Sequence, residues 1–463
     1  MSSFAAVPVR GGARWPSAGV LAAGLAMAIA LGAVVAVRPS AVFALLALAV
    51  FLAAVVLDLP LAVGLLVFLA FVNQVPFFNQ VQDALFAMVG LVAIRAFFDV
   101  RGPGVVALRR QRWLFVALGA LVLWMLLSLA WAVAPDRALT DIRAWVSAAA
   151  VLPLMVATLH TPRDIKVVMA CFVAGAALSV GAGLAGVQML PPNSSWDPDP
   201  TRLRGLEGDP NILAAVALAA TFVACGLFAT WRSVPARALV ATAIAVLATG
   251  FVAAQSRGGL IAAVMVLPFI LFTIRKRGRL LAAVIAVVAI LGAVALFAGL
   301  GRDSDISPSS SSGRNDLWRV AVHMSADHPL LGVGPGGFAA ESARYSRDIG
   351  PIDHVEMLVE KPQNAHNIWL QLLVETGIVG LALLIAVVAV SLRAGRLAVK
   401  RFRRAGRQDL VVLAQSVTIA SLALLAAGSF ISNYANRPLW VLLALGPIML
   451  GVATRDSVAR PRW

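Results

Sequence analysis

The chain has 463 residues, of which 60% are hydrophobic and 13% are charged. About a quarter of the residues in an average soluble protein are charged, so this composition excludes an ordinary soluble domain. The formal net charge of +16 would suit a nucleic-acid partner, but the basic residues lie between apolar runs along the whole chain and form no single patch. We therefore expect a membrane-embedded protein that does not bind nucleic acid.

Apolar runs recur from Leu21 to Leu450, and a helix needs about 20 residues to cross about 30 Å of hydrocarbon. The runs lack the alternation of barrel strands, so helices, which satisfy their own backbone polar groups, should form the spans. The sequence predicts an all-α polytopic inner-membrane protein that forms a single membrane domain over residues 1–463. Because two runs are short, we expect 12 to 14 spans, at residues 17–37, 41–57, 59–73, 81–98, 113–133, 144–160, 167–190, 211–231, 238–255, 260–274, 280–300, 367–392, 410–432 and 438–453.

The basic residues predict the orientation of these spans. If the N-terminus is cytoplasmic, 25 of the 38 Lys and Arg residues fall in or beside loops on the cytoplasmic side, as the positive-inside rule requires. Both termini are then cytoplasmic, and residues 301–366 form a large periplasmic loop. The first apolar run is longer than the core of a secretory signal and another run follows it at once, so we expect an uncleaved helix there.

Two arginines lie in unusual loops on the predicted periplasmic side. Arg204 belongs to "TRLRGLEGDPN" (201–211), and Arg257 lies in "QSRGGL" (255–260), a tight connection between two apolar runs. A guanidinium deep in lipid costs about 3 kcal/mol or more, so Arg257 should lie at the membrane surface or in a cleft open to the periplasm. Gly258 and Gly259 would allow a ligand to approach the backbone. Either arginine could also be an ordinary surface charge.

The polar segment 301–366 contains a predicted amphipathic helix. In "RNDLWRVAVHMSADHP" (314–329), Leu317, Ala321 and Met324 share one face, and Pro329 should end the helix. The glycines of "LLGVGPGGF" (330–338) predict a tight turn and not a nucleotide-binding loop, because no strand precedes them and no Lys-Ser or Lys-Thr pair follows. Nine acidic residues against six basic ones in 301–366 argue against a polyanion-binding domain, whereas a few arginines could still bind one diphosphate.

His366 and Asn367 stand where an apolar run begins. At 100° per residue, Leu370, Leu373 and Gly377 project on about the same side of the helix as His366, and close helix packing is expected beneath the histidine. Glu375 lies on the opposite side and needs a partner, for which Gln371 is the candidate. A histidine at this position can be a helix cap or an interface residue. Its imidazole, neutral near pH 7, also suits a general base.

These motifs together resemble a known family. "HNIWLQLLVETGIVG", with His366-Asn367, nine residues and then Gly377-x-x-Gly380, is similar to the signature of the bacterial O-antigen ligase and polymerase superfamily. "RNDLWRVAVHMSADHPLLGVGPGGF", "RLRGLEGDPNILA" and "SRGGL" resemble other segments of that family in the same order. The resemblance covers about residues 200–380.

The resemblance implies a reaction and a set of site residues. Members transfer a glycan from an undecaprenyl diphosphate carrier to an acceptor at the periplasmic face of the inner membrane, without a metal or another cofactor. His366 would then be the general base, and Arg204 and Arg257 would bind the diphosphate and stabilise its developing charge. Arg314 and Asn367 are further candidates for binding the substrate. Inversion at the anomeric carbon is expected.

Three functions remain open from the sequence. A ligase that transfers O-antigen to a glycolipid such as lipid A core is the first choice, because the His-Asn and Gly-x-x-Gly spacing is kept. A polysaccharide polymerase of the same superfamily, whose acceptor is another lipid-linked glycan, is the second. A secondary transporter would also have 12 to 14 helices, but transporters usually place ionisable groups at mid-membrane, and most of these spans have none.

Overall fold

The computed structural model describes residues 49–72, 90–92, 95, 103–189, 201–273, 314–352, 358, 364–431 and 436–458. The chain divides into two compact units, Met1–Ala54 and Val55–Trp463. Of the first unit, only residues 49–54 are described, and they are helical. The predicted spans at 17–37 and 280–300, and most of the one at 81–98, lie outside the described residues.

The described part of the second unit is helical and contains no strand, which confirms the predicted all-α class. Two short 3-10 helices, η1 (Ser128–Ala130) and η4 (Gly428–Phe430), accompany its α-helices. The α-helices are α3 (Leu59–Leu69), α6 (Pro103–Arg110), α7 (Arg112–Leu127), α8 (Pro135–Ala149), α9 (Val151–Thr158), α10 (Pro162–Leu184), α11 (Pro210–Thr230), α12 (Val234–Ala253), α13 (Arg257–Thr273), α15 (Arg314–Asp327), α16 (Gly337–Tyr345), α17 (Ile368–Arg404), α18 (Gln408–Ala427) and α19 (Arg437–Val458).

Eight helical segments in the described residues are long and apolar enough to cross a membrane, and α3 and α13 are shorter apolar helices. The protein is therefore a polytopic membrane protein. The total of 12 to 14 spans stays a prediction, as does a single domain over the whole chain. The eight segments are Arg112–Ala130, Pro135–Thr158, Pro162–Leu184, Pro210–Thr230, Val234–Ala253, Ile368–Arg404, Gln408–Phe430 and Arg437–Arg455.

Local capping explains where several of these helices begin. Thr161 and Asp164 form a capping box at the start of α10, in which each side chain accepts a backbone N–H of the other residue. Asp209 caps α11 by accepting the N–H groups of Asn211 and Ile212. Proline follows each of these two caps, at a position where the missing N–H costs nothing.

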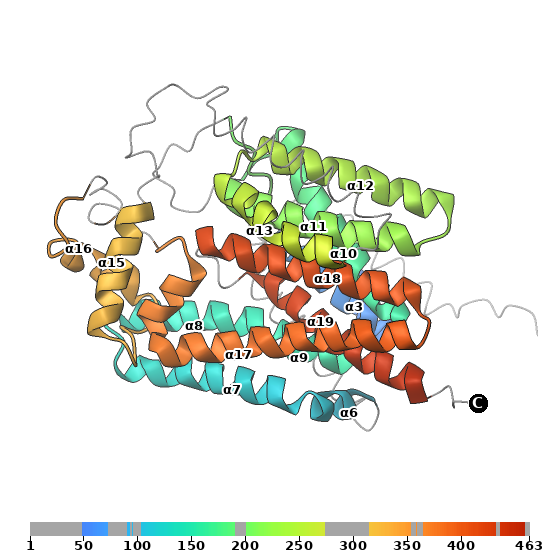
Figure 1. The fold of residues 1–463 in the computed structure, drawn as a ribbon, viewed down its shortest axis with the longest axis horizontal. Coiled ribbons are helices and arrows are strands. Elements are labelled where there is room, and N and C mark those ends of the chain that lie inside the picture. The colour runs from blue at the N-terminus through green and yellow to red at the C-terminus, as the bar shows by residue number, and fades with distance from the viewer. Residues whose placement is uncertain are drawn as a thin grey trace, which may run out of the picture. The chain divides into compact units, whose positions relative to one another are not determined.

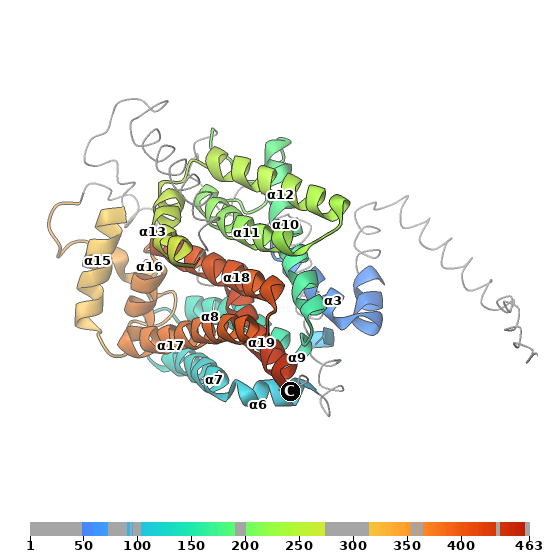
Figure 2. The ribbon, with the colours of Figure 1, turned by 45° about the vertical axis from the view of Figure 1, so that its right-hand side comes forward.

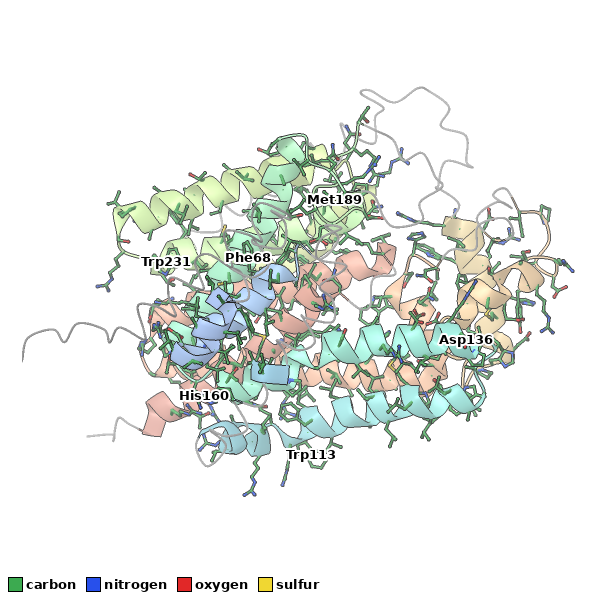
Figure 3. All side chains as sticks on the ribbon, turned by 180° about the vertical axis from the view of Figure 1, so that it is seen from behind. Phe68, Trp113, Asp136, His160, Met189 and Trp231 are labelled. Carbon is green, nitrogen blue, oxygen red and sulfur yellow. The ribbon has the colours of Figure 1, made fainter. Side chains whose placement is uncertain are left out.

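The helices pack side by side, with α18 against α11 and α13, and α17 against α7, α18 and α19 (Figure 1). The two ends of this bundle carry different segments. Asp136 lies at the end where α15 and α16 are found, whereas His160 and Trp231 lie towards the opposite end (Figure 3). This arrangement agrees with the predicted alternation of loops between two sides. Which side is the periplasm stays a prediction.

The predicted amphipathic helix in 301–366 is confirmed as α15. Its buried face carries Leu317, Val320, Ala321 and Met324, all fully buried. They pack with Phe338 and other apolar side chains of a small separate core. Figures 1 and 2 both show α15 and α16 beside the first part of α17. The predicted turn at 330–338 is also present, with positive φ at Gly332, Gly334 and Gly336.

Helix α17 is interrupted at Gly377, whose φ of 67° and ψ of −173° are not helical. The prediction of a continuous helix with Gly377 packed under His366 is therefore wrong. The turn 329–334 docks at the interruption: Val333 N–H and Gly334 N–H donate to the carbonyls of Val374 and Glu375, and Ile378 N–H donates to the carbonyl of Pro329. The break thus satisfies backbone groups of both segments.

Candidate functional site

His366 lies just before α17 and not within it. Asn367 is the N-cap, and its side-chain oxygen accepts the backbone N–H groups of Trp369 and Leu370. His366 itself has a φ of 50°, in the left-handed region that is uncommon for residues other than glycine. The expected placement of His366 on a helix face with Leu370 is therefore wrong, because the asparagine begins the helix one residue later. The substrate-binding role predicted for Asn367 stays a prediction.

The backbone before His366 is held from two sides. Ala365 N–H donates to Gln371 Oε1 at 2.6 Å, and the carbonyl of Ala365 accepts the indole N–H of Trp318 at 2.9 Å. Ala365 is fully buried. Since Trp318 belongs to α15 and Gln371 to α17, these two helices together fix the position of the histidine.

The predicted partner of Glu375 is confirmed. Gln371 Nε2 donates to Glu375 Oε1 at 2.5 Å, and both residues are buried. The carboxylate also accepts backbone N–H groups from Gly336 and Phe338 at the start of α16. A carboxylate is favourable at a helix N-terminus because the free N–H groups and the helix dipole face it. Glu375 and Gln371 thus connect α16, α17 and the segment that carries His366.

The loop that carries Arg204 is anchored on the end of α10. Leu206 N–H donates to Ser179 Oγ at 3.1 Å, and the carbonyl of Gly205 accepts the N–H of Met189 at 2.9 Å. A Cβ on Gly205, whose φ is 56°, would lie 2.4 Å from the carbonyl oxygen of Ser179, so only glycine fits there. Arg204, one residue earlier, is 6% exposed. The bulk of its side chain is therefore buried in the protein and not spread on the surface.

The two predicted arginine motifs are neighbours in space. Arg202 Nη2 and Ser256 Oγ both donate to the side-chain oxygen of Asn211, at 3.0 and 2.8 Å. Leu203 N–H donates to the carbonyl of Ala253 at 3.0 Å. These bonds join the loop of Arg204 to the turn that precedes Arg257, the first residue of α13.

A chain of packed residues leads from Arg257 to His366. Gly258, next to Arg257, packs on Phe430, since a Cβ there would lie 2.7 Å from the Cβ of Phe430. The ring of Phe430 contacts the ring of Trp318, with centroids 6.4 Å apart. Trp318 in turn bonds to the residue before His366. Four segments that are distant in sequence therefore meet at the end of the bundle that holds α15.

Electrostatics connect His366 most directly to Arg314. Burial first, and then the positive charge of Arg314, lower the pKa of His366 from 6.5 to about 4, whereas the charge of Asp209 opposes this shift. Burial also lowers the pKa of Arg314, and Asp209 again acts in the opposite direction. The imidazole is thus neutral at pH 7, and it is affected by the charges of Arg314 and of Asp209, the cap of α11.

Glu207 is a residue that the sequence analysis did not single out. Burial first, and then the charge of Asp209, raise the pKa of Glu207 to about 8. Its Oε1 is buried and has no hydrogen-bond partner among the described residues. A protonated carboxyl can donate a hydrogen bond, so Glu207 is a candidate donor. The sequence feature that could have indicated Glu207 is its position between Gly205 and Gly208, in the same motif as Arg204.

This arrangement suits transfer to a hydroxyl group. A neutral imidazole can accept a proton, and nearby guanidinium groups can bind phosphate oxygens in pairs. The structure brings His366 close to Arg314 and joins the segments of Arg204 and Arg257 to the same region.

Residues 241–385 match the family model described as O-antigen ligase. This match supports the resemblance to the O-antigen ligase superfamily over these residues. A search of curated proteins finds no match. The matched region contains Arg257, Arg314 and His366, whereas Arg204 precedes it. The match supports a membrane enzyme of the glycosyl-transfer type, and the roles of these four residues stay predictions.

Proposed function

We propose that the protein is an O-antigen ligase, which transfers a glycan from undecaprenyl diphosphate to a hydroxyl of a glycolipid such as lipid A core. The reaction would take place at the periplasmic face of the inner membrane. The observation that carries this proposal is the neutral imidazole of His366 close to Arg314, within a domain of the O-antigen ligase family.

In the proposed reaction, the acceptor oxygen attacks the anomeric carbon of the donor sugar from the side opposite the diphosphate. The bond between this carbon and the diphosphate oxygen breaks, and the carrier leaves with the electron pair. His366 takes the proton of the acceptor hydroxyl. Displacement of this kind inverts the anomeric carbon.

The arginines would act on the leaving group. Arg204 and Arg257 bind the diphosphate, and Arg314 adds positive charge beside His366. Because negative charge grows on the diphosphate as the bond breaks, these groups stabilise the transition state more than the ground state. A diphosphate bound there would also offset the charge of Arg314 and raise the pKa of His366, which would make the imidazole a stronger base.

The test is an assay with purified protein, a defined undecaprenyl-diphosphate glycan and a lipid A core acceptor. We expect His366→Ala to lower transfer by about 100-fold or more. The control is His328→Ala, an exposed histidine at the end of α15. Arg204→Ala and Arg257→Ala should raise the KM for the lipid-linked donor. Full activity of His366→Ala would exclude His366 as the general base. Gradient-driven solute flux without glycan transfer would favour a transporter.

A polysaccharide polymerase is the second candidate, because the domain match supports the ligase and polymerase superfamily as a whole. Deletion of the protein in cells distinguishes the two. Loss of a ligase leaves long glycans unattached to lipid A core, whereas loss of a polymerase leaves single repeat units. Single units would reverse our preference.

A further inference from the structure

A cavity lined in part by His160 lies towards the end of the bundle opposite α15 (Figure 3). It has a volume of about 370 Å³ and opens between α6, α9, α19 and the end of α17. Much of its wall is apolar, including Val106, Val156 and Ile448. Three arginines from different helices also line it, namely Arg110, Arg401 and Arg455.

Two of these arginines are hydrogen-bonded to uncharged groups. Arg455 donates to the carbonyl of His160 at 3.3 Å and lies 3.4 Å from its Nδ1, and Arg401 donates to the hydroxyl of Thr454. Among the described side chains, no carboxylate forms an ion pair with any of the three arginines. A cavity with three guanidinium groups therefore has donors in excess of its acceptors.

Asp164, whose charge acts on Arg455, is already engaged. Its Oδ2 accepts the backbone N–H groups of His160 and Thr161, and its Oδ1 accepts the hydroxyl of Thr161. Burial first, and then the charge of Arg455, lower the pKa of His160. The imidazole is thus neutral, and the positive charge of the cavity comes from the arginines.

We infer that this cavity binds the phosphate headgroup of an anionic phospholipid. Guanidinium groups recognise phosphate oxygens through paired hydrogen bonds, and basic pockets between transmembrane helices suit lipid headgroups on the cytoplasmic side. The apolar wall favours a molecule with acyl chains over a free phosphate ion. The predicted cytoplasmic side of the membrane is also the side at which the cavity lies. This inference does not depend on the proposed function.

The lipid would join helices whose ends repel each other. Arg110 and Arg455 come from α6 and α19, and the charge of Arg401 is added from α17. A phosphate between them replaces repulsion with attraction. We therefore expect bound lipid to stabilise the protein.

The experiment uses the full chain in an uncharged detergent after delipidation. Phosphatidylglycerol, phosphatidylcholine and sodium phosphate are added separately, and binding is followed by native mass spectrometry and by the midpoint of thermal unfolding. Phosphatidylglycerol should be retained and should raise the midpoint by several degrees, whereas the other two should have much smaller effects. Equal effects of phosphatidylcholine would overturn the inference, and equal effects of sodium phosphate would overturn the assignment to a lipid.

Variants locate the binding. Each basic residue near a membrane surface contributes about 1 kcal/mol, so Arg401→Gln should weaken phosphatidylglycerol binding about fivefold and Arg401→Gln with Arg455→Gln about 30-fold. Arg401 is exposed, so the single variant tests the site even if the double variant folds poorly. The control is Arg404→Gln, which removes the same charge from an exposed position on the same helix outside the cavity. Equal binding by the Arg401 and Arg404 variants would contradict the site.

Discussion

Gly377 interrupts α17 directly opposite the backbone of Leu330. A Cβ at Gly377 would lie 2.1 Å from the carbonyl oxygen of Leu330 and 2.3 Å from its carbonyl carbon. The φ of 67° with a ψ of −173° adds a second obstacle, because essentially only glycine adopts this conformation. The first glycine of the Gly-x-x-Gly pair therefore has a structural explanation: it lets the turn 329–334 dock on α17.

We predict that Gly377→Ala destabilises the protein by about 2 kcal/mol or more, since strain and a backbone clash both oppose it. Thermal unfolding in detergent measures this change. The matched control is Gly119→Ala in α7, where a Cβ would meet nothing within 4 Å and should be neutral or stabilising by about 0.5–1 kcal/mol. Equal midpoints for the two variants would contradict the explanation of the motif.

The pH dependence of transfer should report the pKa of His366. A general base works when it is unprotonated, so activity should be present above its pKa and lost as the pH falls through it. For the free enzyme this pKa is about 4, and kcat/KM should stay level down to about pH 5. Arg314→Gln removes a positive charge that lowers the pKa of His366, so its acidic limb should move to higher pH. Arg347→Gln, at an exposed position, should leave the limb in place; if both variants behave alike, Arg314 does not act on His366.

Glu207 should make the free energy of unfolding depend on pH, whereas a glutamine at this position should not. Its folded pKa of about 8 is above the usual 4.5, so the folded state holds the proton between these values while the unfolded state loses it. Stability contributed by this group is present below about pH 4.5 and lost as the pH rises towards 8. Glutamine does not ionise, so Glu207→Gln should not show this loss. The unfolding midpoint of the variant should therefore increase relative to that of the wild type as the pH rises. A constant difference across pH 5 to 8 would show that Glu207 is ionised in the folded protein.

Local patterns predicted part of the site well. The period of Leu317, Ala321 and Met324 predicted α15, and the spacing of four residues between Gln371 and Glu375 predicted their hydrogen bond. The start of α17 was also readable, because asparagine is a preferred N-cap. The prediction that His366 shares a helix face with Leu370 overlooked that signal.

The remaining features depend on contacts between distant segments. The break at Gly377 forms because the turn 329–334 supplies partners for the carbonyls of Val374 and Glu375, and no pattern within α17 contains that information. The contact between the Arg204 loop and the turn before Arg257 likewise depends on Asn211, whose side-chain oxygen accepts hydrogen bonds from Arg202 and Ser256. Burial of Glu207 follows from the same tertiary packing, so its raised pKa could not be inferred from the chain.

Trp318 should position His366 without touching the substrate. Trp318→Phe removes the indole N–H that bonds to the carbonyl of Ala365, but it keeps an aromatic ring to pack on Phe430. The loss of one hydrogen bond should cost about 1 kcal/mol of stability. A larger effect on catalysis is expected, because a displaced base transfers protons poorly: kcat should fall at least about tenfold, with little change in the KM for the lipid-linked donor.

The control for this variant is Trp113→Phe, since Trp113 is 66% exposed and lies towards the other end of the bundle (Figure 3). It should leave both kcat and KM unchanged. The pH dependence of kcat/KM distinguishes a displaced imidazole from one whose pKa has changed. Trp318→Phe should lower the maximum value of kcat/KM, and the pH at which activity falls on the acidic side should stay near that of the wild type. A wild-type kcat for Trp318→Phe would mean that the remaining bonds to Ala365 and Asn367 are sufficient to hold His366.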